Sequence, residues 1–351
     1  SDGNGFEGWI WKGDTSSDTI DGHFFSYGFA LDMVAETPSE KFRAYRLIDA
    51  LASYILECDL YYVDITGERT KWGRWNPNDL NANPSYYSER GLNSVEILGY
   101  MALAYSVTGN ETYHAVFEHL ARGEPEYYLN TLNSKLDSPG EDNHSDNQLH
   151  FLAYNILFYA YARLEDDEQT WAQGWQQPPV QDSARAAFRS RLRSMVRPVL
   201  KSVNRWHSIV RREQSPMWLG AVALAARADG AADSSDSSDG SGADILDVTH
   251  ADVTAATENL QQWAIDMVQW QYDTTAGGVR WDVVSSPYLA RDDKTPIMRD
   301  ILPPQERVVT HWNADPYTEG VQGSGNAEYA PCEWTLPYWL MVYYGVLATP
   351  Q

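Results

Sequence analysis

Residues 89–109 read ERGLNSVEILGYMALAYSVTG, and residues 111–132 read ETYHAVFEHLARGEPEYYLNTL. Apolar side chains recur in both stretches at intervals of three and four residues, the spacing of one face of an α-helix. Gly109 and Asn110 between them predict that the first helix stops and a second one restarts after a tight turn. The two stretches are therefore expected to form an antiparallel helical hairpin.

The same helical rhythm recurs along most of the chain. It is found in seven other stretches, at 18–36, 39–62, 145–165, 181–209, 216–228, 251–270 and 335–347. Successive antiparallel helices joined by short turns favour a mainly α fold, an (α/α) toroid or incomplete (α/α) barrel whose connections form a funnel at one end. A helical solenoid is the competing architecture, although no repeat of constant period is present.

Three segments depart from the helical pattern. Residues 61–75 alternate around Thr66 and Gly67, which predicts a small β-hairpin that projects from the helical body. Residues 229–244 contain almost only Asp, Ser, Gly and Ala, and we expect a flexible, solvated insertion there. Residues 271–334 show no helical pattern and predict a long irregular C-terminal excursion. The whole chain, 1–351, is expected to form one domain.

Composition excludes several classes of partner. The formal net charge is −23, from 49 Asp and Glu against 26 Lys and Arg. A surface of this sign repels phosphate backbones, so nucleic acid is not an expected partner. No apolar run approaches the roughly 20 residues that cross a bilayer, and we expect a secreted protein that does not insert into membranes. Cys58 and Cys332 form either one long-range disulfide or two buried thiols.

The segment WKGDTSSDTIDGHFF (11–25) contains the densest cluster of ionisable residues. Asp18 is explained by the dipole of the helix that starts there. Asp21 and His23 lie further inside an apolar helix, where an ionisable side chain needs a partner, and both are candidate functional residues. A structural calcium ion bound by Asp14, Asp18 and Asp21 is the alternative, because carboxylates are the hard ligands that calcium prefers.

A second cluster surrounds the start of the helix at 89–109. Glu89 is a candidate catalytic carboxylate and Arg90 a candidate substrate ligand, although a helix cap with a local salt link is the alternative explanation and is slightly favoured. Aromatic rings precede them in the chain, and sugar rings stack on such platforms. The candidate stacking residues are Trp72, Trp75 and Tyr87.

A third cluster, SPGEDNHSDNQLHFLAYNIL (138–157), precedes and enters the helix at 145–165. His144 is the candidate proton carrier, because histidine titrates near neutral pH, and Asn143 beside it is a candidate substrate ligand. His150 lies on an apolar face and is interpreted as a core residue. Further along the chain, three residues of the expected loops are candidate substrate ligands: Arg211, Trp312 and Tyr317.

Helical hairpins combined with an Asn-His-Ser helix start resemble the (α/α)-toroid carbohydrate-active enzymes, including alginate-lyase-like polysaccharide lyases. That resemblance implies that Asn143 neutralises a uronate while His144 abstracts a proton, with Arg211 and Tyr317 available as their companions. The motifs GDTSSD, ERGLNS and NHSDN together also look like an uncharacterised group of secreted microbial proteins, a resemblance that implies no activity.

Three functions remain open at this point. The first is hydrolysis of a glycosidic bond, which requires an acid and a base on opposite sides of the bond; Asp21 and Glu89 are the candidate pair, with His144 on a substrate hydroxyl. The second is a polysaccharide lyase that uses His144 or Tyr317 as base. The third is a non-catalytic protein that binds glycans or builds an extracellular structure. In each reading the partner is an oligo- or polysaccharide, and no cofactor is required.

Overall fold

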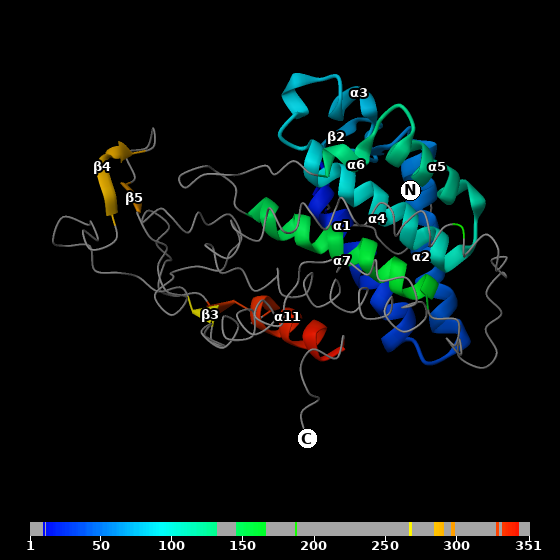
Figure 1. The fold of residues 1–351 in the computed structure, drawn as a ribbon. Helices are drawn as coiled ribbons and strands as arrows, with labels where there is room; N and C mark the ends of the chain where they lie inside the picture. The colour runs from blue at the N-terminus through cyan, green and yellow to red at the C-terminus, as the bar shows by residue number, and fades with distance from the viewer. Residues whose placement is uncertain are drawn as a thin grey trace, which may run out of the picture.

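The computed structural model of the chain describes residues 10, 12–131, 145–165, 187, 267–268, 284–290, 296–298, 328–329 and 332–343. This part of the protein is mainly helical with small two-stranded sheets, as Figure 1 shows. The predicted mainly α fold with a small β-hairpin is confirmed at this level. The insertion expected at 229–244 and the helix expected at 216–228 lie outside the described residues, as does nearly all of the helix expected at 181–209.

The first expected hairpin is present. Helix α1 (Ser17–Phe29) continues directly into one π-helical segment, η1 (Ala30–Val34), and helix α2 (Pro38–Glu57) returns after a short turn. The start of α2 is fixed by a reciprocal cap, in which the Thr37 hydroxyl accepts from the Glu40 amide while the Glu40 carboxylate accepts from the Thr37 amide. The turn at Thr37 therefore separates the two helices as expected.

Strands β1 (Tyr61–Val63) and β2 (Arg69–Arg74) form the predicted antiparallel hairpin. An isolated two-stranded hairpin is marginally stable in water, so its anchors matter. The Tyr54 hydroxyl of α2 donates to the Val63 carbonyl, and the Asp14 carboxylate accepts from the Lys71 amide. Two short segments, α3 (Pro77–Leu80) and η2 (Pro84–Tyr86), then lead the chain to the next long helix.

Helix α4 (Arg90–Thr108) is the centre of the described fold. Every residue from Gly91 to Thr108 is buried, and α4 packs against α1, α2, α5 and α7. The helix ends at Gly109, whose φ of 68° is the left-handed conformation that glycine adopts without strain. Helix α5 (Glu111–Arg122) follows, which confirms the hairpin predicted at this turn.

One predicted helix is shorter than expected. The stretch 111–132 is interrupted after Arg122 and resumes only as the short helix α6 (Tyr127–Asn130). A Cβ on Gly123 would lie 2.4 Å from the His119 carbonyl oxygen, so the chain leaves the helix at a position where only glycine fits. The Pro125 carbonyl accepts from the Asn81 side chain instead of from a helical amide.

Helices α1, α4 and α7 (Ser145–Glu165) run parallel to one another. The Phe24 ring stacks on the Tyr100 ring, with centroids 4.1 Å apart, and one turn further on Gly28 faces both Leu103 and Tyr159. Residue numbers therefore increase together along the contact. Figure 1 shows α4 and α7 side by side. The N-terminal ends of the three helices consequently lie at one end of the bundle.

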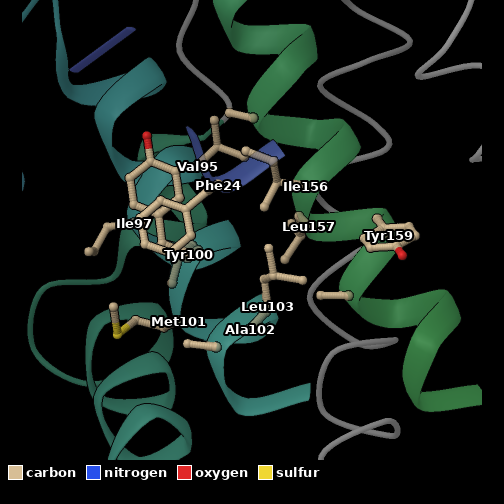
Figure 2. Packing of buried hydrophobic residues seen from close by; sticks show 14 of the residues in the cluster. Phe24, Val95, Ile97, Tyr100, Met101, Ala102, Leu103, Ile156, Leu157 and Tyr159 are labelled. Atoms are coloured by element: carbon tan, nitrogen blue, oxygen red, sulfur yellow. The ribbon is translucent and has the colours of Figure 1, made fainter. Parts of the chain in front are cut away.

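The core lies between these helices. Figure 2 shows apolar side chains of α4 and α7 interdigitating, with the rings of Phe24 and Tyr100 face to face. Gly99 permits the close approach, since a Cβ there would lie 3.3 Å from the Ala153 carbonyl oxygen. Leu340 of helix α11 (Cys332–Tyr343) belongs to the same core.

The C-terminal third corrects two expectations. Met267 and Val268, placed in a helix by their apolar spacing, form strand β3, which pairs with β6 (Glu328–Tyr329). The excursion at 271–334, expected to be irregular, contains β4 (Val284–Ala290) paired with β5 (Pro296–Met298). Short apolar runs do not distinguish a helix from a strand, which explains the first error. Helix α11 forms despite Pro337 within it, close to the range expected.

Two further expectations concern single features. Cys58 is a free thiol and half-buried, so the disulfide alternative is wrong for this residue. Among the residues that the structure describes, none of the helices is both long enough and apolar enough to span a bilayer.

Candidate functional site

The candidate site is a group of polar side chains buried at the N-terminal end of the parallel helices. Asp21 lies in the second turn of α1, and Glu96 lies two turns into α4. Both carboxyl groups are fully buried, at 0% exposure, although the helices around them are strongly apolar. They meet because α1 and α4 are parallel and place Asp21 at the level of Glu96. We call Asp21, Glu96, Tyr100 and Trp75 the acid cluster.

Glu96 is held by the end of the β-hairpin. The Trp75 indole N–H donates to the Glu96 carboxylate at 2.8 Å, and the ring of Trp75 is itself fully buried. The Tyr127 hydroxyl donates to the Trp75 carbonyl at 2.6 Å, which fixes the backbone that carries this indole. Hydrogen bonds to a charged acceptor are about twice as strong as neutral ones, so the indole favours an ionised Glu96.

Asn93, one turn before Glu96, joins strand β2 to helix α4. Its amide group donates to the carbonyls of Trp72 and Arg74 at 3.2 and 2.9 Å. Both carbonyls belong to strand β2. The hairpin and the first turns of α4 therefore form one rigid unit around the cluster.

Asp21 is in the opposite situation, because its neighbours disfavour its charge. Burial raises the pKa of Asp21 well above its usual value of 3.8, and the nearby Glu96 and Asp18 raise it further. The Tyr100 hydroxyl lowers this pKa by a smaller amount. No hydrogen bond of full geometry reaches either Asp21 oxygen from the described residues. Burial and the neighbouring Glu96 therefore both favour the protonated form of the Asp21 carboxyl group.

Tyr100 completes the cluster from one turn beyond Glu96. Burial raises the pKa of its hydroxyl well above 10, as do the carboxyl groups of Asp21 and Glu96. Phe24 covers the ring at a near-parallel angle of 8°, and Trp75 packs against it edge-on. The phenol thus remains neutral, and its hydroxyl is directed by aromatic packing toward the two acids.

A protonated acid next to a group that accepts hydrogen bonds is the arrangement used to deliver a proton. The acid cluster has such a pair, and its two members differ in environment, since the Glu96 carboxylate receives the indole N–H. Within the part of the chain that the structure describes, the charges that act on Asp21 are those of Glu96 and Asp18, and no cation is among them. The cluster is therefore not an ordinary buried ion pair.

The predicted residues at the start of α4 lie near this cluster but at its outer edge. Glu89 occupies the cap position of α4 at 7% exposure, and the Ser88 hydroxyl donates to it at 3.1 Å. The Arg90 guanidinium lies over the exposed ring of Tyr87, 5.4 Å from its centroid. Glu89 and Glu96 are seven residues apart on one helix, which places them on one face.

The predicted stacking residues and His23 fall in different environments. His23 is exposed and stacks on Tyr27, with centroids 5.3 Å apart, so it needs no buried partner. Trp72 is half-buried and Trp75 is completely buried. We expected Trp75 at the mouth of a cleft, but its ring lies in the interior, because strand β2 turns its indole toward Glu96. Its place is structural support for the cluster and not an exposed platform.

The remaining candidates cannot be placed. Five of them lie outside the described residues: Asn143, His144, Arg211, Trp312 and Tyr317. His150 is described, and the interpretation as a core residue is confirmed by its exposure of 1%. Burial lowers the pKa of His150 to about 3, so its ring is neutral at physiological pH.

The acidic residues of α1 do not gather around a metal site. Asp14 accepts from the Lys71 amide, while its own amide donates to the Asp64 carboxylate, so it ties the N-terminal segment to the hairpin. In the described ranges, no three His, Cys, Asp or Glu side chains are grouped closely enough to hold a metal ion. The proposed calcium site of Asp14, Asp18 and Asp21 is therefore not formed there.

Glu96 and Tyr100 are the site residues that the sequence did not single out as candidates. The signal that could have found them is the one that found Asp21: an ionisable side chain inside an unbroken apolar helix.

Comparison of the chain with family models, curated proteins and solved structures finds no match.

Proposed function

We propose that this protein is a secreted carbohydrate-active enzyme that cleaves a glycosidic bond by acid–base hydrolysis, with Asp21 as the proton donor. The observation that carries the proposal is the full burial of the Asp21 carboxyl group beside Glu96, which raises its pKa, with no cation acting on Asp21 among the described residues. A glycosidase needs one carboxyl group whose pKa is raised, so that it protonates the leaving oxygen at neutral pH. Asp21 is the group with that property.

Glu89 is proposed as the base. It precedes Glu96 by seven residues, which is roughly 10 Å of helix rise, and Asp21 lies at the level of Glu96. A separation of this order leaves room for a water molecule between acid and base, as in hydrolases that invert the sugar configuration. Glu96 acts as a positioning residue, because its charge holds the proton on Asp21.

The (α/α) toroid belongs to the same proposal. The parallel arrangement of α1, α4 and α7, with α2 and α5 as returning helices, is the pattern expected when inner and outer helices alternate. Helix α7 begins one residue after His144, and its N-terminal end lies at the same end of the bundle as Asp21. His144 is proposed to bind a substrate hydroxyl there.

A second candidate is a non-catalytic protein in which the acid cluster is part of the core. The observation that favours it is the complete burial of Asp21, Glu96 and Tyr100, since a catalytic acid must reach its substrate. The two candidates differ in what the Asp21 proton does. In an enzyme its loss stops turnover, whereas in a core it changes only stability.

The test is incubation of the full chain with neutral and uronate-containing polysaccharides, following reducing ends and the absorbance of unsaturated products together. Hydrolysis releases reducing ends without unsaturated products, and elimination by the alternative lyase releases both. Asp21→Asn and Glu89→Gln should each lower turnover by at least 100-fold, in line with the contribution of a general acid or base. Glu57→Gln, an exposed carboxylate at the end of α2, is the matched control and should keep full activity.

Circular dichroism of each variant separates lost chemistry from lost folding. Full activity in both folded variants would remove the hydrolase assignment. Absence of product from every polysaccharide with the unmodified chain would favour the non-catalytic protein.

A further inference from the structure

Two exposed cations of strand β2 lie on aromatic rings. The Arg69 guanidinium is 3.6 Å from the centroid of the Tyr61 ring, and the Lys71 ammonium is 4.2 Å from that of the Trp72 ring. Both cations are exposed, while Tyr61 is buried beneath Arg69 and Trp72 is half-buried. We call Arg69, Lys71 and Trp72 the basic face of the hairpin.

The two cations of the basic face make no direct ion pair within the described residues. Neither Arg69 nor Lys71 makes an ion pair there, whereas Arg74 on the same strand pairs with Asp79 at 3.1 Å. Arg69 and Lys71 are two residues apart, so they project from the same side of the strand. Two neighbouring cations without a carboxylate in ion-pair contact thus lie together on one strand of a chain whose net charge is −23.

The backbone beneath the basic face is rigid. The Lys71 amide donates to the Asp14 carboxylate at 2.7 Å, and the Trp72 carbonyl accepts from the Asn93 side chain at 3.2 Å. The Tyr86 hydroxyl donates to the Lys71 carbonyl at 3.3 Å. Each of these contacts comes from a different element. A ligand bound by these side chains would therefore not have to order the hairpin, which lowers the entropic cost of binding.

The basic face also adjoins the acid cluster. Asn93 joins Trp72 to helix α4 one turn before Glu96, and Trp75, which follows the end of the strand, donates its indole N–H to Glu96. A sugar chain lying on the hairpin would thus extend toward the end of the bundle that carries Asp21 and Glu89. The basic face is in the right place to serve as a substrate subsite.

We propose that the basic face binds an acidic sugar residue, through its carboxylate or sulfate group. Arg69 and Lys71 supply donors of the charge that such a group requires, and the Trp72 ring supplies a surface for the apolar face of the sugar. A neutral sugar would use the ring alone. This proposal rests on the proposed function for its choice of carbohydrate, and it narrows the substrate to anionic glycans.

The net charge of the protein predicts how this binding depends on salt concentration. An anionic polymer is repelled at long range, but screening at about 0.15 M salt limits that repulsion to about 8 Å. Binding should therefore be weak at very low salt, strongest near physiological ionic strength and weaker again at 1 M, where the two local cations are screened as well.

The experiment uses affinity gel electrophoresis of the full chain carrying Asp21→Asn, so that binding is measured without turnover. The probes are polygalacturonate, dextran sulfate and unmodified dextran. The two dextrans differ only in sulfate, and polygalacturonate supplies carboxylate, so the arms separate the two sources of charge. Retardation by at least one acidic polymer and not by dextran is the expected result.

The double variant Arg69→Gln and Lys71→Gln should weaken that retardation at least tenfold, and Arg69→Lys with Lys71→Arg should restore most of it. Arg46→Gln is the matched control, because Arg46 is also an exposed cation over a ring, 6.0 Å from the centroid of Phe42 on α2. It should change retardation by less than twofold.

Equal retardation by dextran, no retardation by any polymer, or an equal loss in the Arg46 variant would overturn the inference. Binding and cleavage together distinguish failure of this inference from failure of the proposed function. Binding to an acidic polymer without cleavage by the unmodified chain would leave the basic face standing and remove the hydrolase. Cleavage by the unmodified chain, together with normal binding by the double variant, would remove the basic face and leave the hydrolase standing.

Discussion

Each end of the first helical segment carries an aspartate that faces another helix, half-buried Asp32 at one end and fully buried Asp21 at the other, and the two have opposite kinds of neighbour. Asp32, in the π-helical turn that ends the segment, accepts hydrogen bonds from Arg163 and from the Tyr159 hydroxyl, both of α7. Asp21, eleven residues earlier, faces Glu96 of α4 instead. Both contacts join parallel helices across the same core. One acid is met by an opposite charge and the other by a like charge.

This difference separates an acid that stabilises the fold, Asp32, from one that destabilises it, Asp21. A buried carboxylate with a cation and a hydroxyl is satisfied, and its loss leaves the partner charge uncompensated. A buried acid opposite another acid must keep a proton, which costs stability whenever the surrounding pH favours ionisation. Groups that persist in such an unfavourable environment are typical of functional sites.

The largest loss of stability is expected at the end of the segment where Asp32 contacts Arg163. The side chain of Arg163 is 1% exposed, so Arg163→Met should leave Asp32 with only the Tyr159 hydroxyl in this contact. We expect the free energy of unfolding to fall by about 3 kcal/mol, at the lower limit for a broken buried pair because Asp32 retains some solvent contact. Urea denaturation at pH 7 measures this loss.

The double variant Arg163→Met with Asp32→Asn is its control, since removing both charges should recover much of the loss. If the single and double variants are equally unstable, the ion pair does not account for the effect, and the packing of the Arg163 stem does.

A smaller loss is expected from Trp75→Phe at the other end. The substitution removes the indole N–H that donates to Glu96 and leaves a small cavity. A hydrogen bond to a charged acceptor contributes about 2 kcal/mol, and we expect a loss of that order at pH 7. Tyr127→Phe, which removes the neutral hydrogen bond to the Trp75 carbonyl, should cost about 1 kcal/mol by the same measurement. A Tyr127→Phe loss as large as that of Trp75→Phe would mean that Glu96 carries no charge in the folded state.

Much of the helical framework could be predicted from the sequence, because its signals are local. The turn at Gly109 combines a helix stop with a left-handed φ, and the alternation in 61–75 predicted the hairpin correctly. The break after Arg122 was missed because it depends on the Asn81 contact to Pro125, which comes from forty-four residues earlier. Local periodicity carries no information about such a partner.

The sequence predicted only part of the candidate site. Asp21 was identified because an ionisable group inside an apolar helix requires an explanation. Its partner was not, because the meeting of Asp21 with Glu96 depends on which faces of α1 and α4 pack together. Trp75 was placed on the surface for a related reason: alternation along a strand predicts two faces but does not say which of them a neighbouring helix will cover.

At pH 7, Asp21→Asn should change the free energy of unfolding by less than each of the three substitutions above, and it should raise that free energy instead of lowering it. Because the pKa of Asp21 is raised in the folded protein, the folded state binds more protons than the unfolded state from about pH 3.8 upward. Wild-type stability therefore falls as the pH rises through this window, until Asp21 ionises in the folded state as well. The amide cannot ionise, so the stability of the variant relative to wild type should increase from pH 5 to pH 9.

Urea denaturation of both proteins at pH 5, 7 and 9 measures this difference. His150 also titrates differently on folding, with a pKa lowered to about 3, and so reduces stability as the pH falls below 6.5. Its contribution is common to both proteins and cancels in the difference. Asp32→Asn is the matched comparison at the other end of the segment, and it should be less stable than wild type at all three pH values.

If Asp21→Asn is less stable than wild type at pH 9, Asp21 is a structural acid whose carboxylate is stabilised by its neighbours, as that of Asp32 is. A variant that is more stable and also inactive would identify a carboxyl group retained at a cost to the fold. That combination is expected of a catalytic acid and not of a core residue, because a core residue that destabilises the protein is not retained for its packing. The stability measurement therefore shows whether Asp21 is held at a cost to the fold, and the activity of the same variant shows whether that cost serves catalysis.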